Sequence, residues 1–372
     1  MSSTSISPTP STASTNAVAW ADPQRENHFE HWFASLQAVH GLDRKSLHLA
    51  SADASFRRYL RVTGTSAART GSLIIMDAPP DKENSQPFVH VAGLMDAAGL
   101  KAPKVLAWDE ANGFMLLTDL GHKTMMQALD PAAPPPLALY LEAVDTLVQW
   151  QLASQPDVLP PYDEALLRRE LNLFPDWYIA QHRQVMLDAD QRKVLDDAFT
   201  RIVKSNLAWP SVYVHRDFMP RNLMVGTGGI ARVHDEKLGV LDFQDAVYGP
   251  ITYDIASLMR DAFLSWDEDF CLDVTIRYWQ KARKAGLPVG DDFGEFYKGV
   301  EWMGLQRHLK VAGIFARLTL RDGKPQYLAD TPRFIAYMRA TCGRYMELKP
   351  LLRLIEKVEG IELPPVFAFG RS

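Results

Sequence analysis

The sequence has little cysteine, no long apolar run and none of the common zinc motifs. Two cysteines, Cys271 and Cys342, cannot build a disulfide framework, and neither CxxC nor HExxH occurs. No stretch of about 18 apolar residues is present, so no transmembrane helix is predicted. A G-x-x-x-x-G-K-[ST] loop is missing too, which excludes a nucleotide site of the P-loop type. These absences favour a soluble protein of a reducing compartment, and we expect it to be cytoplasmic.

The sequence also has no large excess of positive or negative charge. Lys and Arg total 40 against 45 Asp and Glu, which gives a net charge of -5. This mildly acidic balance argues against a nucleic acid or an anionic membrane as the main partner. The chain is 47% hydrophobic and 10% aromatic, so it can bury a sizeable core. Its 372 residues predict about two domains, and no pattern indicates an oligomeric state.

The N-terminal segment has a different composition from the rest of the chain. Ten of the first fifteen residues are Ser or Thr, and no charged residue precedes Asp22. A secretory signal would need a basic start and an apolar core, and an organellar transit peptide would need arginines. We therefore expect residues 1–22 to form a disordered Ser/Thr-rich extension.

The order of periodic patterns predicts an α+β protein. An apolar stripe at helical spacing runs from Phe29 to Val39, and a second helix fits Pro87–Ala98. The pattern is also helical from Leu137 onward, apart from one β island at residues 212–214, 223–225 and 240–243. The N-terminal third contains β-type runs joined by turn-rich segments, the longest of which spans 63–72. These runs occupy residues 56–62, 73–76, 105–108 and 114–118.

The strongest chemical signal is the segment 215–222, which reads H-x-D-x-x-x-x-N. It contains Asp217 and ends at Asn222, and Asp242 follows twenty residues later. Residues 223–225 and 238–243 are typical of two strands, closed by a Gly-rich turn at 226–229. Such a hairpin would bring Asn222 and Asp242 to the same end of the ribbon.

Phosphoryl transfer needs this combination of side chains. A carboxylate must orient the attacking hydroxyl and accept its proton, and separate oxygen ligands must hold Mg²⁺ against the nucleotide phosphates. Mg²⁺ prefers hard oxygen donors and keeps several waters, so two protein ligands suffice. We predict Asp217 as the base and Asn222 and Asp242 as the metal ligands. Either half of the pattern alone would equally be ordinary turn chemistry.

These residues resemble the catalytic loop and metal-binding segment of the protein-kinase superfamily. Residues 249–256 are similar to the G-P-x-x-x-D-[LI]-A segment of aminoglycoside-phosphotransferase-like kinases, in which the Asp, here Asp254, supports the loop. The resemblance implies a two-lobed protein-kinase-like fold that uses ATP and Mg²⁺. Pro250 follows Asp242 by only eight residues, which leaves no room for the peptide platform of protein kinases. A small hydroxylated substrate is therefore favoured.

Four segments narrow the resemblance, which runs from Trp32 to Tyr345. Residues 53–59, 76–80, 215–224 and 242–250 resemble the bacterial kinases that phosphorylate cell-wall amino sugars at the anomeric hydroxyl. The likeness implies that N-acetylmuramate and N-acetylglucosamine are converted to their 1-phosphates during peptidoglycan recycling. It also implies a nucleotide-binding lobe over residues 23–118 and a catalytic, substrate-binding lobe over residues 119–372.

The resemblance places the nucleotide at two segments. The first is the turn at residues 51–55, where Ser55, Arg57 and Arg58 are candidates for phosphate contacts, although an exposed basic turn would have the same composition. The second is the hinge, where Asp119 and Leu120 would contact adenine mainly through their main chain.

One position departs from the kinase pattern. The strand at residues 73–76 places Met76 where most kinases have a phosphate-pairing lysine, and residues 88–98 contain no Glu to pair with such a lysine. Arg58, Lys82 or a metal ion would have to replace that charge. The departure also leaves a non-catalytic nucleotide-binding regulator as an alternative function.

The segment at residues 168–178 resembles a characteristic segment of the amino-sugar kinases. Planar polar groups and aromatic faces suit a sugar, although an aromatic at helical spacing is equally typical of a core. The candidate sugar-binding residues are Glu170, Asn172, Trp177 and Tyr178. Four basic residues could face the anionic lactyl group or form a solvated face: Arg307, His308, Lys310 and Arg317. A kinase of the aminoglycoside or choline type, acting on another small alcohol, is the second alternative.

Overall fold

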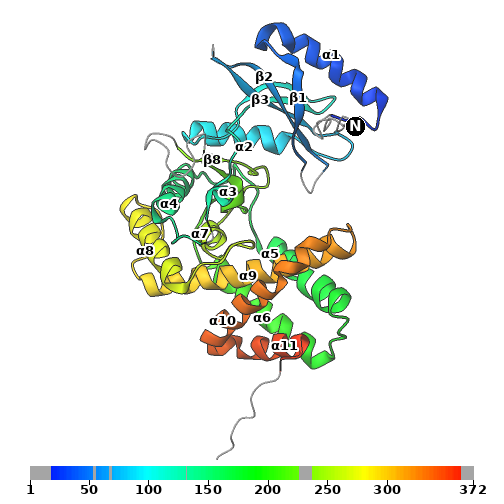
Figure 1. Ribbon diagram of the computed structural model, residues 1–372. Helices are drawn as coiled ribbons and strands as arrows, with labels where there is room; N and C mark the ends of the chain where they lie inside the picture. Colours follow the sequence, from blue (N-terminus) through cyan, green and yellow to red (C-terminus); the bar gives the residue numbers. More distant parts are fainter. Residues whose placement is uncertain (1–17, 53–55, 67–68, 131, 226–236, 362–372) are drawn as a thin grey trace, which may run out of the picture. The chain divides into compact units, whose positions relative to one another are not determined.

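The computed structural model describes residues 18–52, 56–66, 69–130, 132–225 and 237–361 (Figure 1). The chain divides into two compact units, which are described separately here. The N-terminal unit comprises Met1–Gly93 and Ala102–Leu120, and the C-terminal unit comprises Leu94–Lys101 and Gly121–Ser372. Among the described residues, no helix is both long enough and apolar enough to cross a membrane.

The N-terminal unit contains one antiparallel five-stranded sheet with the strand order β1-β2-β3-β5-β4. Two strands are longer than predicted, because the segment expected to be a turn over residues 63–72 is largely paired: Thr63 lies opposite Ser72, and Thr65 opposite Thr70. The first strand was not predicted, since its sequence is mostly polar. The strands are β1 (Asp43–Ala52), β2 (Arg58–Ser66), β3 (Arg69–Asp77), β4 (Val105–Asp109) and β5 (Phe114–Thr118).

Helix α1 (Pro23–His40) covers one face of this sheet. Its N-terminus is capped by Asp22, whose carboxylate accepts a hydrogen bond from the Gln24 amide, and its apolar stripe is the one predicted. Phe29 and Phe33 pack against a cluster of strand residues that the sheet turns toward the helix. That cluster comprises Leu42, Leu47, Leu60, Val62, Leu73, Ile75, Phe114 and Leu116. Val39, at the end of the predicted stripe, is instead exposed.

Residues 18–22 belong to the segment that was predicted to be a disordered extension. Residues 1–17 lie outside the described residues, but Val18 and Trp20 pack against the same core as α1. The Trp20 ring lies 4.8 Å from the ring of Phe29. Residues 18–22 are therefore part of the fold, because they bury apolar surface that a disordered extension would leave in water.

Two further predictions of local structure are confirmed in this part of the chain. The second predicted helix is α2 (Gln86–Ala97). The connection between β4 and β5 is a tight turn, in which Gly113 takes a left-handed φ of 71° and donates a hydrogen bond to the Asp109 carbonyl. A Cβ at Gly113 would lie 2.0 Å from the Ala78 carbonyl oxygen, so glycine is required there on two grounds.

The C-terminal unit is mostly helical, as predicted. Helix α9 (Phe293–Leu320) runs through it and packs against the π-helix η1 (Phe174–His182) and helix α7 (Thr252–Met259) (Figure 1). The other α-helices are α3 (Met125–Ala128), α4 (Leu137–Leu152), α5 (Glu164–Leu171), α6 (Ala189–Leu207), α8 (Glu268–Lys284), α10 (Thr331–Arg344) and α11 (Lys349–Glu359). The short 3₁₀ turns in the described part of the chain are η2 (Pro220–Asn222), η4 (Pro325–Asp330) and η5 (Met346–Leu348).

The predicted β island forms two small antiparallel ribbons. Strand β7 (Leu223–Met224) pairs with β8 (Gly239–Val240), which is the expected hairpin. Strand β8 is shorter than predicted because Asp242 has a left-handed φ of 63°, a conformation that a strand cannot contain. Strand β6 (Ser211–Val214) pairs with β9 (Val247–Pro250), which was not predicted because its Gly and Pro are more typical of a turn.

Candidate active site

The H-x-D segment leaves β6 and is held by helix α7. Both oxygens of Asp254 accept backbone hydrogen bonds, one from the His215 amide at 2.7 Å and one from the Arg216 amide at 3.0 Å. Arg216 has a left-handed φ of 76°, so these bonds stabilise a conformation that a non-glycine residue rarely adopts. Burial raises the pKa of Asp254 to about 7, while the two amides act in the opposite direction. This is the supporting role that the family resemblance implied for Asp254.

His215 links the two halves of the site. Its Nδ1 accepts a hydrogen bond from the Asp217 amide at 3.2 Å, which leaves Nε2 as the protonated nitrogen that donates to the Leu241 carbonyl at 3.0 Å. Burial lowers the pKa of His215 to about 4, so the ring is neutral at physiological pH. The neutral ring thus fixes the backbone before Asp217 against the backbone before Asp242.

Asn222 and Asp242 lie side by side, which confirms the predicted proximity of these two residues. The Asn222 amide nitrogen donates to the Asp242 carboxylate at 3.3 Å and to the Asp217 carbonyl at 2.8 Å. The register of the hairpin places Leu223 opposite Val240, which brings Asn222 and Asp242 close together. Residues 226–236, which include the predicted Gly-rich turn, lie outside the described residues.

The chemistry of these donors fits Mg²⁺. Both side-chain bonds of Asn222 use its amide nitrogen, so its amide oxygen can serve as a hard ligand. It lies beside the Asp242 carboxylate, which also accepts a hydrogen bond from the Gln244 side chain at 2.9 Å. Among the described residues there is no cluster of three or more His, Cys, Asp or Glu side chains that could hold a metal by itself. Mg²⁺ does not need such a cluster, since it is commonly held by one or two protein oxygens together with water and phosphate.

Glu170, which was predicted as a sugar ligand, is buried beside the loop that carries Asp217. Arg216 and Lys310 pair with one of its oxygens, the latter at 2.9 Å. The Gln306 side chain at 3.0 Å and the Tyr162 hydroxyl bond the other. Burial alone would raise the pKa of Glu170, but the two cations and the hydroxyl hold it at about 2. Glu170 is therefore fully engaged by the protein and orients the side chain that precedes Asp217.

Two of the four basic candidates on α9 lie near Asp217. Arg307 is buried and donates to the Arg216 carbonyl at 2.6 Å, and Lys310 lies 3.3 Å from the Tyr253 hydroxyl. Burial disfavours the charged forms of Arg307 and Lys310, yet the pKa of both is raised, with Tyr253 and Asp217 among the groups responsible. Asp217 thus has three buried or half-buried cations around it.

The other two basic candidates are engaged elsewhere or only half-buried. The Nε2 of His308 lies 3.1 Å from the Arg260 carbonyl, and burial lowers the pKa of this ring to about 3. Burial also lowers the pKa of Arg317, which lies ten residues further along α9 than Arg307.

The predicted sugar-binding residues do not form one group. Tyr178 is buried, stacks on Phe174 and donates to Glu359 at 2.8 Å, so it joins η1 to the end of α11. Asn172 is exposed at the C-terminus of α5, and Trp177 is half-buried. The structure therefore gives Tyr178 and Glu170 different partners in different parts of the unit.

The predicted nucleotide residues have distinct environments in the N-terminal unit. Ser55 lies outside the described residues. Arg58 pairs with Asp77, and the Asp119 carboxylate accepts hydrogen bonds from Arg61 and Ser72, both at 2.6 Å. The neighbouring Leu120 is buried, with 9% of its surface exposed. Arg57 pairs with Glu83, a residue that no pattern in the sequence singled out.

Two of the residues that contact Glu170 could not be predicted from the sequence. Tyr162 and Gln306 reach Glu170 only through the packing of distant elements, and nothing in their local pattern marks them. A weak signal existed for Arg307 and Lys310, since they are spaced by three residues on one helix and so share a face.

Comparison with known proteins identifies the family. Residues 46–292 match the model of the phosphotransferase enzyme family, APH. The N-acetylmuramate/N-acetylglucosamine kinase of Neisseria meningitidis serogroup B is 47% identical over 341 residues, covering 91% of this chain and 97% of that protein. The kinase of the same name from Pseudomonas aeruginosa is also 47% identical, covering 82% of this chain and 86% of that protein. The chain belongs to the phosphotransferase enzyme family.

Solved structures confirm the predicted fold. A choline/ethanolamine kinase family protein from Mesorhizobium loti has a TM-score of 0.57 at 14% identity, covering 90% of this chain and 99% of that one. The ADP-bound aminoglycoside phosphotransferase APH(2'')-Ib has a TM-score of 0.54 at 14% identity, covering 86% of this chain and 99% of that one. At these identities the likeness concerns the α+β, protein-kinase-like fold.

Proposed function

We propose that this enzyme transfers the γ-phosphoryl group of ATP to the anomeric hydroxyl of N-acetylmuramate and N-acetylglucosamine. The main support for this proposal is the similarity to a kinase named for these two sugars, which is 47% identical over nearly the full length of both chains. The adjacent Asn222 and Asp242 beside the Asp217 loop are consistent with that chemistry. The products would be sugar 1-phosphates, which fits a role in peptidoglycan recycling in the cytoplasm, where ATP is available.

Asp217 has the central role in this proposal. Its carboxylate orients the anomeric hydroxyl and accepts its proton as the new bond to phosphorus forms. An anomeric hydroxyl is more acidic than an ordinary alcohol, so most of the acceleration comes from positioning and from charge stabilisation. Bound Mg-ATP would supply the phosphoryl group, with Asn222 and Asp242 as the protein ligands of the metal.

The charges around Asp217 do not by themselves decide between an amino sugar and a cationic alcohol. Arg216, Arg307 and Lys310 lie near Asp217, and two of them, Arg216 and Lys310, are paired with Glu170. Glu170, Asp217 and the buried Asp254 therefore balance these cations in large part. The choice of an amino sugar over an aminoglycoside or a choline-like acceptor rests on the identity to the amino-sugar kinases.

The test is direct observation of the product. The protein is incubated with Mg-ATP and each sugar, and phosphorus NMR is used to detect an anomeric phosphate. We expect a product with both sugars, and the absence of product with either one would overturn the substrate assignment. Asp217→Asn should lower kcat by about a thousandfold while ADP still binds. Asp291→Asn, at an exposed carboxylate, is the matched control and should keep wild-type turnover.

A non-catalytic regulator gives the opposite result. If the Asp217→Asn variant and the wild type consume ATP at the same rate in the presence of sugar, the protein does not use Asp217 for catalysis. Loss of turnover in the variant alone excludes the regulator.

A further inference from the structure

The sheet of the N-terminal unit has no lysine where most kinases have their phosphate-pairing cation. Met76 occupies that position on β3, is fully buried, and lies opposite Tyr59 on β2. A methionine cannot neutralise phosphate oxygens. A nucleotide bound to this unit therefore needs a cation from another position.

The two faces of the sheet separate the candidates. Alternate residues of a strand point to opposite faces, and Leu60, Leu73 and Ile75 point toward α1. Arg58 belongs to that face, because it pairs with Asp77 and lies 4.4 Å from the ring of Trp20. Met76 follows Ile75 and so belongs to the opposite face. Arg57 immediately precedes β2 and pairs with Glu83, not with Asp77, the carboxylate that holds Arg58 on the α1 face.

Arg57 forms a nearly buried ion pair with Glu83. The guanidinium and the carboxylate are 3.1 Å apart, and their side chains are only 10% and 11% exposed. Burying two charges is costly, and an arginine at the surface of a turn would normally avoid it. The pair therefore lies at the end of the sheet where β2 begins.

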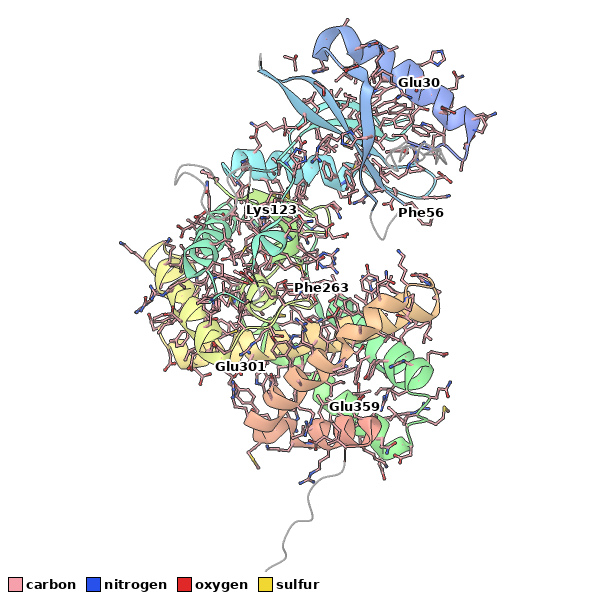
Figure 2. The ribbon with its side chains drawn as sticks, viewed as in Figure 1. Glu30, Phe56, Lys123, Phe263, Glu301 and Glu359 are labelled. Carbon is pink, nitrogen blue, oxygen red and sulfur yellow. The ribbon has the colours of Figure 1, made fainter. Side chains whose placement is uncertain are left out.

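Glu83 also holds the chain around Arg57. Its other carboxylate oxygen accepts a hydrogen bond from the Phe56 amide at 3.0 Å (Phe56 is labelled in Figure 2). Glu83 itself is fixed by a turn, in which its amide donates to the Pro79 carbonyl at 2.9 Å. It lies three residues before α2, outside the segment in which an acidic partner was sought. One carboxylate therefore sets both the backbone and the side chain at the entry to β2.

We propose that Arg57, positioned by Glu83, is the cation that binds the nucleotide phosphates in place of the strand lysine. This arginine–glutamate pair supplies the function of the usual lysine–glutamate pair from the residue that precedes β2 and the turn that precedes α2. A guanidinium has five N–H donors in a planar fork, so a contact with one carboxylate is compatible with further contacts to phosphate oxygens. The proposal rests on the proposed function only in taking a nucleotide as the phosphoryl donor.

The two rival cations, Arg58 and Lys82, contact groups other than Glu83. Arg58 is held on the α1 face by Asp77, and its Nη1 donates to the Ala19 carbonyl at 2.7 Å. The Lys82 ammonium lies 5.0 Å from the centre of the Phe56 ring. The experiment includes both residues, so that the assignment is made by comparison.

Calorimetry with ADP and with adenosine isolates the phosphate contact. Arg57→Met should weaken ADP binding by about ten- to a hundredfold and change adenosine binding by less than about twofold, because only ADP carries phosphates. Glu83→Gln should weaken ADP binding in the same direction by a smaller factor. Arg58→Met and Lys82→Met should keep the wild-type ratio of ADP affinity to adenosine affinity.

Further variants separate binding from folding. Arg57→Lys keeps the charge but loses the fork, and should have an ADP affinity between those of wild type and Arg57→Met. If Arg57→Met does not fold, this second variant decides the question. Arg44→Gln removes an exposed ion pair with Glu30 in the same unit and is the control for losing a surface arginine.

Three outcomes would overturn the assignment. They are an unchanged ADP affinity in a folded Arg57 variant, an equal loss of ADP and adenosine affinity, and a selective ADP loss in Arg58→Met or Lys82→Met. None of these outcomes depends on the sugar. If the wild type makes no sugar phosphate, the proposed function fails while the ADP measurements still test Arg57.

Discussion

The carboxylate of Glu170 is surrounded by two cations and two neutral donors, and its ionisation should contribute to stability. Its pKa in the folded protein is about 2, below the ordinary value of 4.5. The contribution is therefore fully present above pH 4.5 and is lost as the pH falls toward 2. Above pH 4.5 this ionisation contributes about 3 kcal/mol to the free energy of unfolding. We expect Glu170→Gln to be destabilised at pH 6 and to approach the wild type as the pH is lowered to 3, as measured by urea unfolding.

Glu164 offers a matched control on the same helix. Its side chain is 62% exposed, so Glu164→Gln should change the free energy of unfolding by less than about 0.5 kcal/mol at either pH. A difference between wild type and Glu170→Gln that does not vary with pH would contradict the linkage. It would show that the variant acts through packing and not through the charge.

Single residues differ in how far the sequence could predict their contacts. The meeting of Asn222 and Asp242 was predictable, because a hairpin of known period joins them and register is a local property. The contacts of Glu170 were not, since Arg216 is 46 residues away and Gln306 is 136 residues away. The sequence singled out Glu170 only as a candidate sugar ligand, and the packing of α5 against α9 shows which groups it meets.

At the scale of elements, the close approach of α9 to the start of η1 depends on Gly313. A Cβ at this position would lie 2.3 Å from the backbone of Leu173, which immediately precedes η1. Backbone cannot move aside as a flexible side chain can. We expect Gly313→Ala to lower the free energy of unfolding by about 1–3 kcal/mol because α9 and η1 must separate. Urea unfolding measures this loss.

Gly343 on α10 is the matched control for that substitution. Outside its own turn of helix, no atom lies within 4 Å of the position that a Cβ would take, so the methyl group of Gly343→Ala meets open space. Alanine favours helix over glycine by up to about 1 kcal/mol, and this variant should be neutral or slightly more stable. Equal effects at Gly313 and Gly343 would show that the α9–η1 contact tolerates a methyl group.

The elements that the sequence did not reveal share one physical cause. Strand β1 is largely polar and β9 contains Gly and Pro, so neither has the apolar alternation by which strands are recognised. Both exist because a neighbouring strand supplies their hydrogen-bond partners. The helices α1 and α2 were predictable, because an apolar stripe and a Pro or capping residue can be recognised from neighbouring residues alone.

At the scale of the whole molecule, the order of helical and strand patterns predicted an α+β protein, and the resemblance of the motifs implied the kinase-like fold. A strand-rich segment precedes the H-x-D-x-x-x-x-N loop and the second Asp, and the family match over residues 46–292 contains all of them. The sequence showed that Met76 replaces the usual lysine, but it did not show that Arg57 pairs with Glu83. Glu83 and Arg57 are 26 residues apart, and only the turn before α2 brings them together.

Nucleotide binding should stabilise the whole protein through two separable contributions. A ligand at a hundred times its Kd raises the free energy of unfolding by about 2.7 kcal/mol, which is measurable as an increase in Tm. We expect ADP to raise Tm more with Mg²⁺ than with EDTA, because Asn222 and Asp242 then hold the metal. Asp242→Asn should lose this difference and keep the increase seen in EDTA. Arg57→Met should lose about half or more of the increase under both conditions, since its contact is with phosphate. Equal increases with Mg²⁺ and with EDTA in the wild type would mean that Asp242 does not hold the metal.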